Sequence, residues 1–153
     1  MHHYISEIKW TGNRGIGTTD YKSYDRAYTI RINNKAIIQG SSDAAFRGDS
    51  TKHNPEELLL ASLSSCHMLW YLHLCSEEGI VVTEYIDNAK AEMKEEPNGS
   101  GRFVLVTLFP EVTVTESSMI EKAEAMHKKA NEMCFIANSV NFPVKHHPTI
   151  NIV

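Results

Sequence analysis

The sequence predicts an α+β fold, because strand-like segments lie on both sides of one long apolar helix and a second, amphipathic helix follows them. Residues 4–10 alternate polar and apolar side chains, and residues 28–32 and 36–39 have the pattern of a hairpin closed at Asn33-Asn34, which tolerate positive φ. Four further strands, rich in β-branched and aromatic residues, are predicted at residues 80–85, 89–94, 103–109 and 112–115.

The long helix is predicted at residues 56–78 and has a well-marked start and end. Asn54 is a suitable N-cap, Pro55 suits the first helical position, and Glu57 completes a capping box. Gly79 follows as a C′ glycine. Apolar residues occur nearly all round this helix, so we expect other elements to enclose it.

The second helix is predicted at residues 116–133, with apolar positions at three-to-four spacing and Ser117 or Ser118 as its cap. Cys134 lies at the end of this helix or at the start of a short helical turn. Pro143 and Pro148 bracket a last extended segment at residues 149–153.

Composition favours one soluble domain covering residues 1–153. The 153 residues are 42% hydrophobic, which is enough for one core and too little for two comfortable domains. The net charge is -4 and the basic residues are scattered, so we expect no nucleic-acid partner. No secretory signal pattern and no run of eighteen apolar residues occurs, which predicts a cytoplasmic protein without a membrane partner.

The three cysteines are too few and too widely spaced for a secreted disulfide framework. Cys66 and His67 are neighbours that project about 100° apart on a helix, and no Cys-x-x-Cys pair occurs, so we expect no metal site and no cofactor. Cys75 lies nine residues from Cys66, on the opposite face of the helix, and is predicted to be a small buried hydrophobe.

Cys66 and Cys134 are the strongest candidates for function, because a thiol inside a polar-started helix with a second thiol available suits two-cysteine redox chemistry. Trp70 shares the face of Cys66, whereas His73 is about 10 Å further along the axis and is assigned to the core or an interface. Substrate-binding apolar side chains are predicted from the residues near the two cysteines in sequence, namely Met68, Trp70 and Phe135, with Phe142 as a further candidate.

Glu56 stands about 15 Å from Cys66 on a straight helix and cannot touch it within one chain. Two copies of the helix that cross antiparallel near Ala61-Ser62 would bring Glu56 of one subunit near Cys66 of the other. The sequence therefore suggests a homodimer with shared sites; the alternative is that Glu56 serves only the helix N-terminus.

Several motifs carry a resemblance to a known family. Phe46-Arg47-Gly48-Asp49, Asn54-Pro55-Glu56-Glu57-Leu58-Leu59, Ser64-Ser65-Cys66-His67-Met68 and the downstream Cys134 resemble, in order, the osmotically inducible protein C and organic hydroperoxide resistance (OsmC/Ohr) family. The resemblance implies an OsmC-like intertwined homodimer in which antiparallel sheets wrap long central helices.

The resemblance also implies roles for individual residues. It makes Cys66 the peroxidatic cysteine and Cys134 the resolving one, with Glu56 and an arginine organising the first thiolate. We favour Arg47 for that arginine, with Arg14 in the early Gly-rich loop as the alternative. Many members have Pro after the resolving cysteine where this chain has Phe135, so the second site can differ in shape.

The expected activity is that of a thiol-dependent enzyme that reduces organic hydroperoxides to alcohols through a Cys66 sulfenic acid and a Cys66–Cys134 disulfide. A dithiol, a dihydrolipoyl group or a small molecule, would regenerate it. The main alternative is a non-catalytic small-molecule-binding or stress-response protein of the same fold. A third possibility, a thiol-metal site, predicts copurified zinc.

Overall fold

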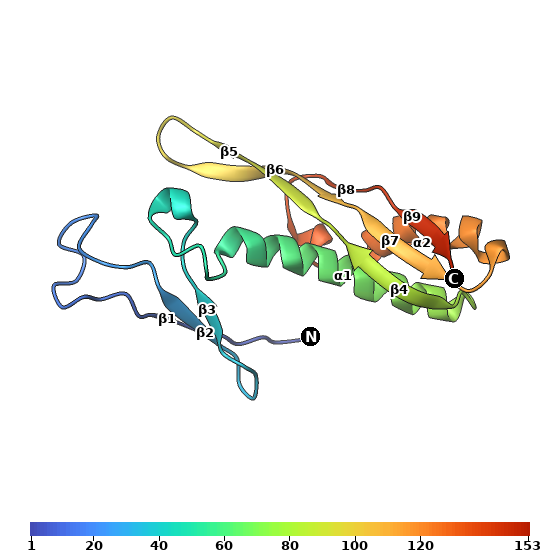
Figure 1. The fold of residues 1–153 in the computed structure, drawn as a ribbon, viewed down its shortest axis with the longest axis horizontal. Coiled ribbons are helices and arrows are strands. Elements are labelled where there is room, and N and C mark those ends of the chain that lie inside the picture. The colour runs from blue at the N-terminus through green and yellow to red at the C-terminus, as the bar shows by residue number, and fades with distance from the viewer. The chain divides into compact units, whose positions relative to one another are not determined.

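A computed structural model describes residues 1–153 (Figure 1), and the chain divides into two compact units, Met1–Leu58 and Leu59–Val153. The boundary falls in the first turn of the long helix.

The first unit is built on a three-stranded antiparallel sheet. Its strands, in sheet order, are β1 (Glu7–Trp10), β2 (Tyr28–Arg31) and β3 (Ile38–Gly40). The predicted hairpin between β2 and β3 is confirmed, and Asn34 in its turn adopts φ 60°. Ile8, Ile30 and Ile38 stand in register across the three strands, which gives the sheet one apolar row.

The long helix α1 (Pro55–Glu77) begins and ends as predicted. The Glu57 N–H donates to the Asn54 side chain at 2.8 Å, and the Asn54 N–H donates to the Glu57 carboxylate at 3.2 Å. This is the reciprocal capping box. Beyond the C-terminus, Gly79 adopts φ 70°, a left-handed conformation that favours glycine.

The second unit contains two three-stranded sheets, each of which mixes antiparallel and parallel pairs. One sheet consists of β4 (Val82–Asp87), β7 (Pro110–Val114) and β9 (Thr149–Ile152), in that order, and the other of β5 (Lys90–Glu95), β6 (Gly101–Leu108) and β8 (Val144–His146). In each sheet the last strand pairs parallel to the middle one. The sheets and helices confirm the predicted α+β class; β8 was not predicted.

The second helix, α2 (Ile120–Met133), follows a short 3-10 turn, η2 (Ser117–Met119), and precedes another, η3 (Ala137–Ser139). The predicted cap is wrong: the residue that precedes the first α-helical residue is Met119, and no side chain caps this end. The serines lie inside the 3-10 turn, where the hydroxyl of Ser118 is paired with the Glu116 carboxylate. Cys134 is the C-cap, as one of the two predicted positions allowed.

Burial along α1 follows one stripe rather than the whole circumference. Its fully buried residues are spaced four apart: Leu63, His67, Tyr71 and Cys75. The prediction that the helix is enclosed on all sides is therefore wrong for the single chain, because the two sheets and α2 cover only one face. Cys75 is buried as predicted.

The core of the second unit has two parts. In one, Tyr71 and Cys75 from α1 pack with Val112 and Val114 of β7 and with α2; in the other, Leu63 packs with Val106 and Leu108 of β6. By length and composition alone α1 could cross a membrane, with mean hydropathy 1.3 over its most apolar window. Core helices of soluble proteins pass the same test, and the buried stripe gives α1 a packing role in this core.

Candidate functional site

The second unit brings the two predicted redox cysteines together. Cys66 is half-buried on α1, and Cys134 is 1% exposed at the end of α2. Burial, with a smaller contribution from the neighbouring Cys66 thiol, raises the pKa of the Cys134 thiol to about 11. Both sulfurs are free thiols. The two thiols are thus neighbours within the second unit.

Backbone groups hold Cys134 at this position. The Ala137 N–H, in the η3 turn, lies 3.4 Å from the Cys134 sulfur and donates to it. The Asn138 N–H donates to the Cys134 carbonyl at 3.0 Å. A thiol with a raised pKa is protonated near neutral pH. Cys134 is therefore suited to respond to an oxidised Cys66 rather than to attack a substrate first.

A carboxylate anchors the Cys66 segment of α1 to the sheets. Asp87, the last residue of β4, accepts the Ser64 hydroxyl at 2.5 Å with one oxygen and the Phe109 N–H at 2.7 Å with the other. Ser64 is two residues before Cys66. Because both carboxylate oxygens are used, this residue fixes the helix against the turn between β6 and β7.

An apolar hollow lies one helical turn beyond Cys66 along α1. Trp70 meets Phe135, the residue after Cys134, edge to face with ring centroids 5.6 Å apart. A hollow of about 190 Å³ is lined by Leu69, Trp70 and His73. His73 is exposed and lies 3.6 Å from the Glu77 carboxylate. The core alternative for this residue is therefore wrong, and the interface alternative stays a prediction.

The side chains predicted to bind substrate have different outcomes. Trp70 lines the hollow and Phe135 packs on it, with 66% of Phe135 exposed. Met68 is half-buried and does not line the hollow. Leu69, which the sequence reasoning missed, takes that place. Helical spacing could have predicted this position of Leu69, since residues 66, 69, 70 and 73 follow the i, i+3, i+4, i+7 pattern of one helix face.

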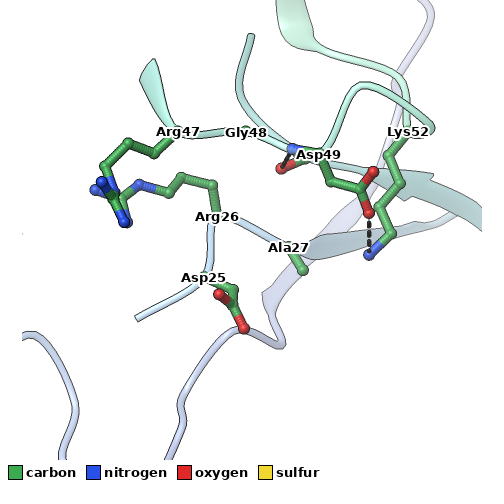
Figure 2. A pocket seen from close by; sticks show the side chains of 8 residues that line it. Asp25, Arg26, Ala27, Arg47, Gly48, Asp49 and Lys52 are labelled. Carbon is green, nitrogen blue, oxygen red and sulfur yellow. Dashed lines mark hydrogen bonds and ion pairs between the residues drawn. The ribbon is translucent and has the colours of Figure 1, made fainter. Parts of the chain in front are cut away.

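Arg47 lies in the first unit, in a polar pocket of about 310 Å³. It caps the 3-10 helix η1 (Ala44–Phe46) with φ 65°. Figure 2 shows Arg47 and Arg26 on one side of this pocket and the Asp49–Lys52 ion pair, at 3.4 Å, on the other. The guanidinium of Arg47 has no hydrogen bond or ion pair within the chain, so it is free to bind an anionic group.

Arg14, the alternative arginine, is bound within its own loop. It donates to the carbonyls of Lys22 and Ser23, and its guanidinium lies 3.7 Å from the Asp25 carboxylate. Its donors are therefore largely in use, whereas those of Arg47 are free. This difference favours Arg47 for the role that the sequence predicts, which stays a prediction.

Glu56 also belongs to the first unit. One of its carboxylate oxygens is buried and has no hydrogen-bond partner. Burial of Tyr28 raises the pKa of its hydroxyl, and the negative charge of Glu56 makes a smaller contribution in the same direction. A buried carboxylate oxygen without a donor is costly, so this position favours a cationic or hydrogen-bonding neighbour.

Metal-binding geometry is absent from the chain: no group of three or more His, Cys, Asp and Glu side chains could hold a metal ion. Cys66 and His67 diverge as expected, since Cys66 is half-buried at the surface of α1 and His67 is 1% exposed in the core.

Comparisons with known proteins agree with this fold. Residues 48–148 match the family described as OsmC-like protein. An OsmC-like protein of unknown function from Vibrio cholerae is 30% identical, with 97% of this chain and 100% of that chain covered and a TM-score of 0.87. An organic hydroperoxide resistance protein from Elizabethkingia anophelis is 19% identical, with 99% of both chains covered and a TM-score of 0.68.

A third structure, an organic hydroperoxide resistance protein from Legionella pneumophila, is 14% identical, covers 99% of this chain and 98% of that chain, and has a TM-score of 0.68. At these lower identities the likeness concerns the fold alone. A comparison with curated proteins gives no match.

Proposed function

The chain belongs to the OsmC-like protein family, and from this premise we propose that it is a thiol-dependent peroxidase that reduces organic hydroperoxides to alcohols. The observation that carries the proposal is the proximity of Cys66 and Cys134, two free thiols from different helices, with an apolar hollow one turn beyond Cys66 on α1.

The reaction balances with these two thiols and a hydroperoxide alone. The Cys66 thiolate attacks the distal oxygen of the O–O bond, the bond breaks, and the alkoxide leaves as alcohol after taking a proton. Cys66 becomes a sulfenic acid. The Cys134 thiol then displaces its hydroxyl as water and forms the Cys66–Cys134 disulfide, which an external dithiol, such as a dihydrolipoyl group, reduces again.

The activating cation in this proposal is Arg47, held by Glu56. A free thiol has a pKa of about 8.5, so a permanently charged guanidinium beside Cys66 would increase its thiolate fraction. The free donors of Arg47 and the unpartnered buried oxygen of Glu56 support this pairing. A carboxylate can hold the guanidinium in a bidentate contact.

A homodimer completes this proposal. The apolar sheet row of the first unit contains Ile8, which is 60% exposed, and α1 is buried along only one stripe. On α1, Ala61 is small and exposed, and the Ser65 hydroxyl is satisfied by the Ala61 carbonyl at 2.7 Å. Small, internally satisfied side chains let a second copy of the helix approach closely.

The hollow favours an alkyl or aryl hydroperoxide over hydrogen peroxide. Leu69 and Trp70 supply apolar surface, and the exposed ring of Phe135 can extend it. Burial of substrate carbon there contributes about 25 cal/mol for each Å² removed from water. Hydrogen peroxide has no carbon to bury. We assign the enzyme to the reducing cytoplasm, where its thiols stay free.

The test is peroxide consumption by three matched variants. Cys66→Ser abolishes turnover of cumene hydroperoxide, and Cys134→Ser consumes one equivalent and leaves a sulfenic acid that dimedone traps. Cys75→Ser, the control, keeps the activity because this thiol is buried among apolar residues. Mass spectrometry of the oxidised wild type shows one Cys66–Cys134 link. Full turnover by Cys66→Ser would refute the proposal and leave a binding protein as the alternative.

A further inference from the structure

Three histidines from three elements meet in the core of the second unit. His67 comes from α1, His127 from α2 and His146 from β8. The ring centroids of His67 and His127 are 5.3 Å apart with the planes nearly parallel, and His146 lies 5.6 Å from the first and 6.1 Å from the second. The proposed peroxidase reaction uses none of them.

The two deepest histidines form the polar link between the helices. His67 is 1% exposed and His127 is 0% exposed, and His67 Nε2 lies 3.0 Å from His127 Nδ1. One of these nitrogens must donate and the other accept. The remaining ring nitrogens, His67 Nδ1 and His127 Nε2, are buried without a hydrogen-bond partner. Nothing at these nitrogens would compensate a positive charge.

Both histidines of this link lie on the helices that carry Cys66 and Cys134. His67 directly follows Cys66 on α1, and His127 is two helical turns before Cys134 on α2. The Tyr71 ring stacks on His127 with centroids 3.9 Å apart, which ties α1 and α2 a second time. Separation of the two histidines would therefore move the helix that ends at Cys134 away from the helix that carries Cys66.

The groups that face the pair offer no negative charge. They are Tyr71 on α1, Tyr85 on β4 and His146 on β8, while β7 and β9 contribute apolar side chains. Tyr71 and Tyr85 have pKa values raised mainly by burial, so both are neutral. No Asp or Glu forms an ion pair with any of the three imidazoles. His146 itself has a pKa lowered by burial and, to a smaller extent, by repulsion from His147.

We propose that His67 and His127 form an acid-sensitive latch between α1 and α2, which is closed while both imidazoles are neutral and opens in mild acid to expose Cys134. Burial lowers both pKa values most and repulsion by neighbouring histidines adds to this, so that the pKa of His67 is about 4 and that of His127 about 3. The closed state thus excludes protons that the open state accepts.

The size of the response follows from this difference. In the open state each histidine takes up a proton below its ordinary pKa of about 6.5. Between pH 7.0 and pH 5.5 the ratio of open to closed molecules then rises about seventyfold for two histidines and about eightfold for one. Acid favours the open state because the pKa values of both histidines are lowered in the closed state.

Cys134 itself reports on the latch, since it is 1% exposed when the latch is closed. A Cys66→Ala/Cys75→Ala background leaves Cys134 as the only thiol and requires no peroxidase activity. Its reaction with 4,4′-dithiodipyridine is measured at pH 7.0 and pH 5.5. Each rate is divided by that of a peptide with the sequence of residues 132–136, which removes the intrinsic pH dependence of the chemistry. The expected result is a rise of about seventyfold in this ratio.

Variants separate the latch from other effects of acid. His127→Gln and His67→Gln keep a polar side chain but leave one titrating imidazole of the pair, so the rise falls to about eightfold in each. His73→Gln, an exposed histidine on the same helix, leaves it at about seventyfold. If one glutamine variant does not fold, the other and the unsubstituted pair still give the comparison.

Two results would overturn the latch. One is a ratio that does not change between pH 7.0 and pH 5.5. The other is labelling of Cys134 with the same rate and urea dependence as unfolding of the whole chain, because opening would then be global. Loss of peroxidase activity in other variants affects neither outcome.

Discussion

Removal of the Asp87 carboxylate is predicted to loosen α1 from the sheets. Asp87 accepts one hydrogen bond from Ser64 at 2.5 Å and one from the Phe109 N–H at 2.7 Å. Hydrogen bonds to a charged group contribute about 1.5–3 kcal/mol each. Asp87→Ala also leaves the partly buried Phe109 N–H without an acceptor, so we expect the free energy of unfolding to fall by about 3–5 kcal/mol.

A double-mutant cycle isolates the bond to α1. Ser64→Ala alone should cost about 1–3 kcal/mol, and in the Asp87→Ala background it should cost much less, with a coupling energy of about 1–2 kcal/mol. Ser65→Ala is the matched control: its hydroxyl bonds only to its own helix, so it should change stability by no more than about 0.5 kcal/mol.

The assay is urea unfolding followed by far-ultraviolet circular dichroism, at one protein concentration because association would shift the apparent stability. Additive effects of Ser64→Ala and Asp87→Ala, within about 0.3 kcal/mol, would show that the two side chains do not interact and would refute the reasoning.

Three further predictions concern pH, packing and specificity. Burial lowers the pKa of His67 and of His127, so their stabilising effect is complete above about pH 6.5 and is lost as the pH falls towards their folded-state pKa values. Urea unfolding should show that the free energy of unfolding falls by about 2.5 kcal/mol from pH 7.0 to pH 5.5. A free energy of unfolding that does not change over this range would contradict the prediction. Leu63→Ala empties a fully buried position and should cost about 2–5 kcal/mol by the same assay, whereas the same substitution at the exposed Leu69 should cost less. Trp70→Ala should lower kcat/KM for cumene hydroperoxide by about tenfold and should change kcat/KM for hydrogen peroxide little. An equal loss for both peroxides would show that the hollow does not bind the organic part of the substrate.

Local signals predicted the fold where neighbours in sequence determine the structure. Asn54 and Glu57 form their capping box within one turn, and Asn34 takes the positive φ of its hairpin, because these effects need no distant partner. The cap at Ser117 or Ser118 failed since a 3-10 turn precedes α2 and uses both serines. Strand β8 has three residues and exists only through its pairing with β6, which no local pattern reveals.

The site was predictable only in part for the same reason. Helix geometry predicted that Cys75 is buried, which is confirmed, and it placed Trp70 on the face of Cys66, which stays a prediction. The approach of Cys134 to Cys66 came from the family resemblance, because it depends on the packing of α2 on α1. His127 belongs to the buried face of α2, whereas its bond to His67, 60 residues away, is a property of the tertiary structure.

The two parallel edge strands have a consequence for synthesis of the chain. β8 and β9 lie within the last ten residues, and each supplies the third strand of a different sheet whose middle strand was made about forty residues earlier. Neither sheet can be completed on the ribosome until almost the whole chain has emerged. Until then β6 and β7 each keep an unpaired edge, the condition in which nascent chains aggregate or recruit chaperones.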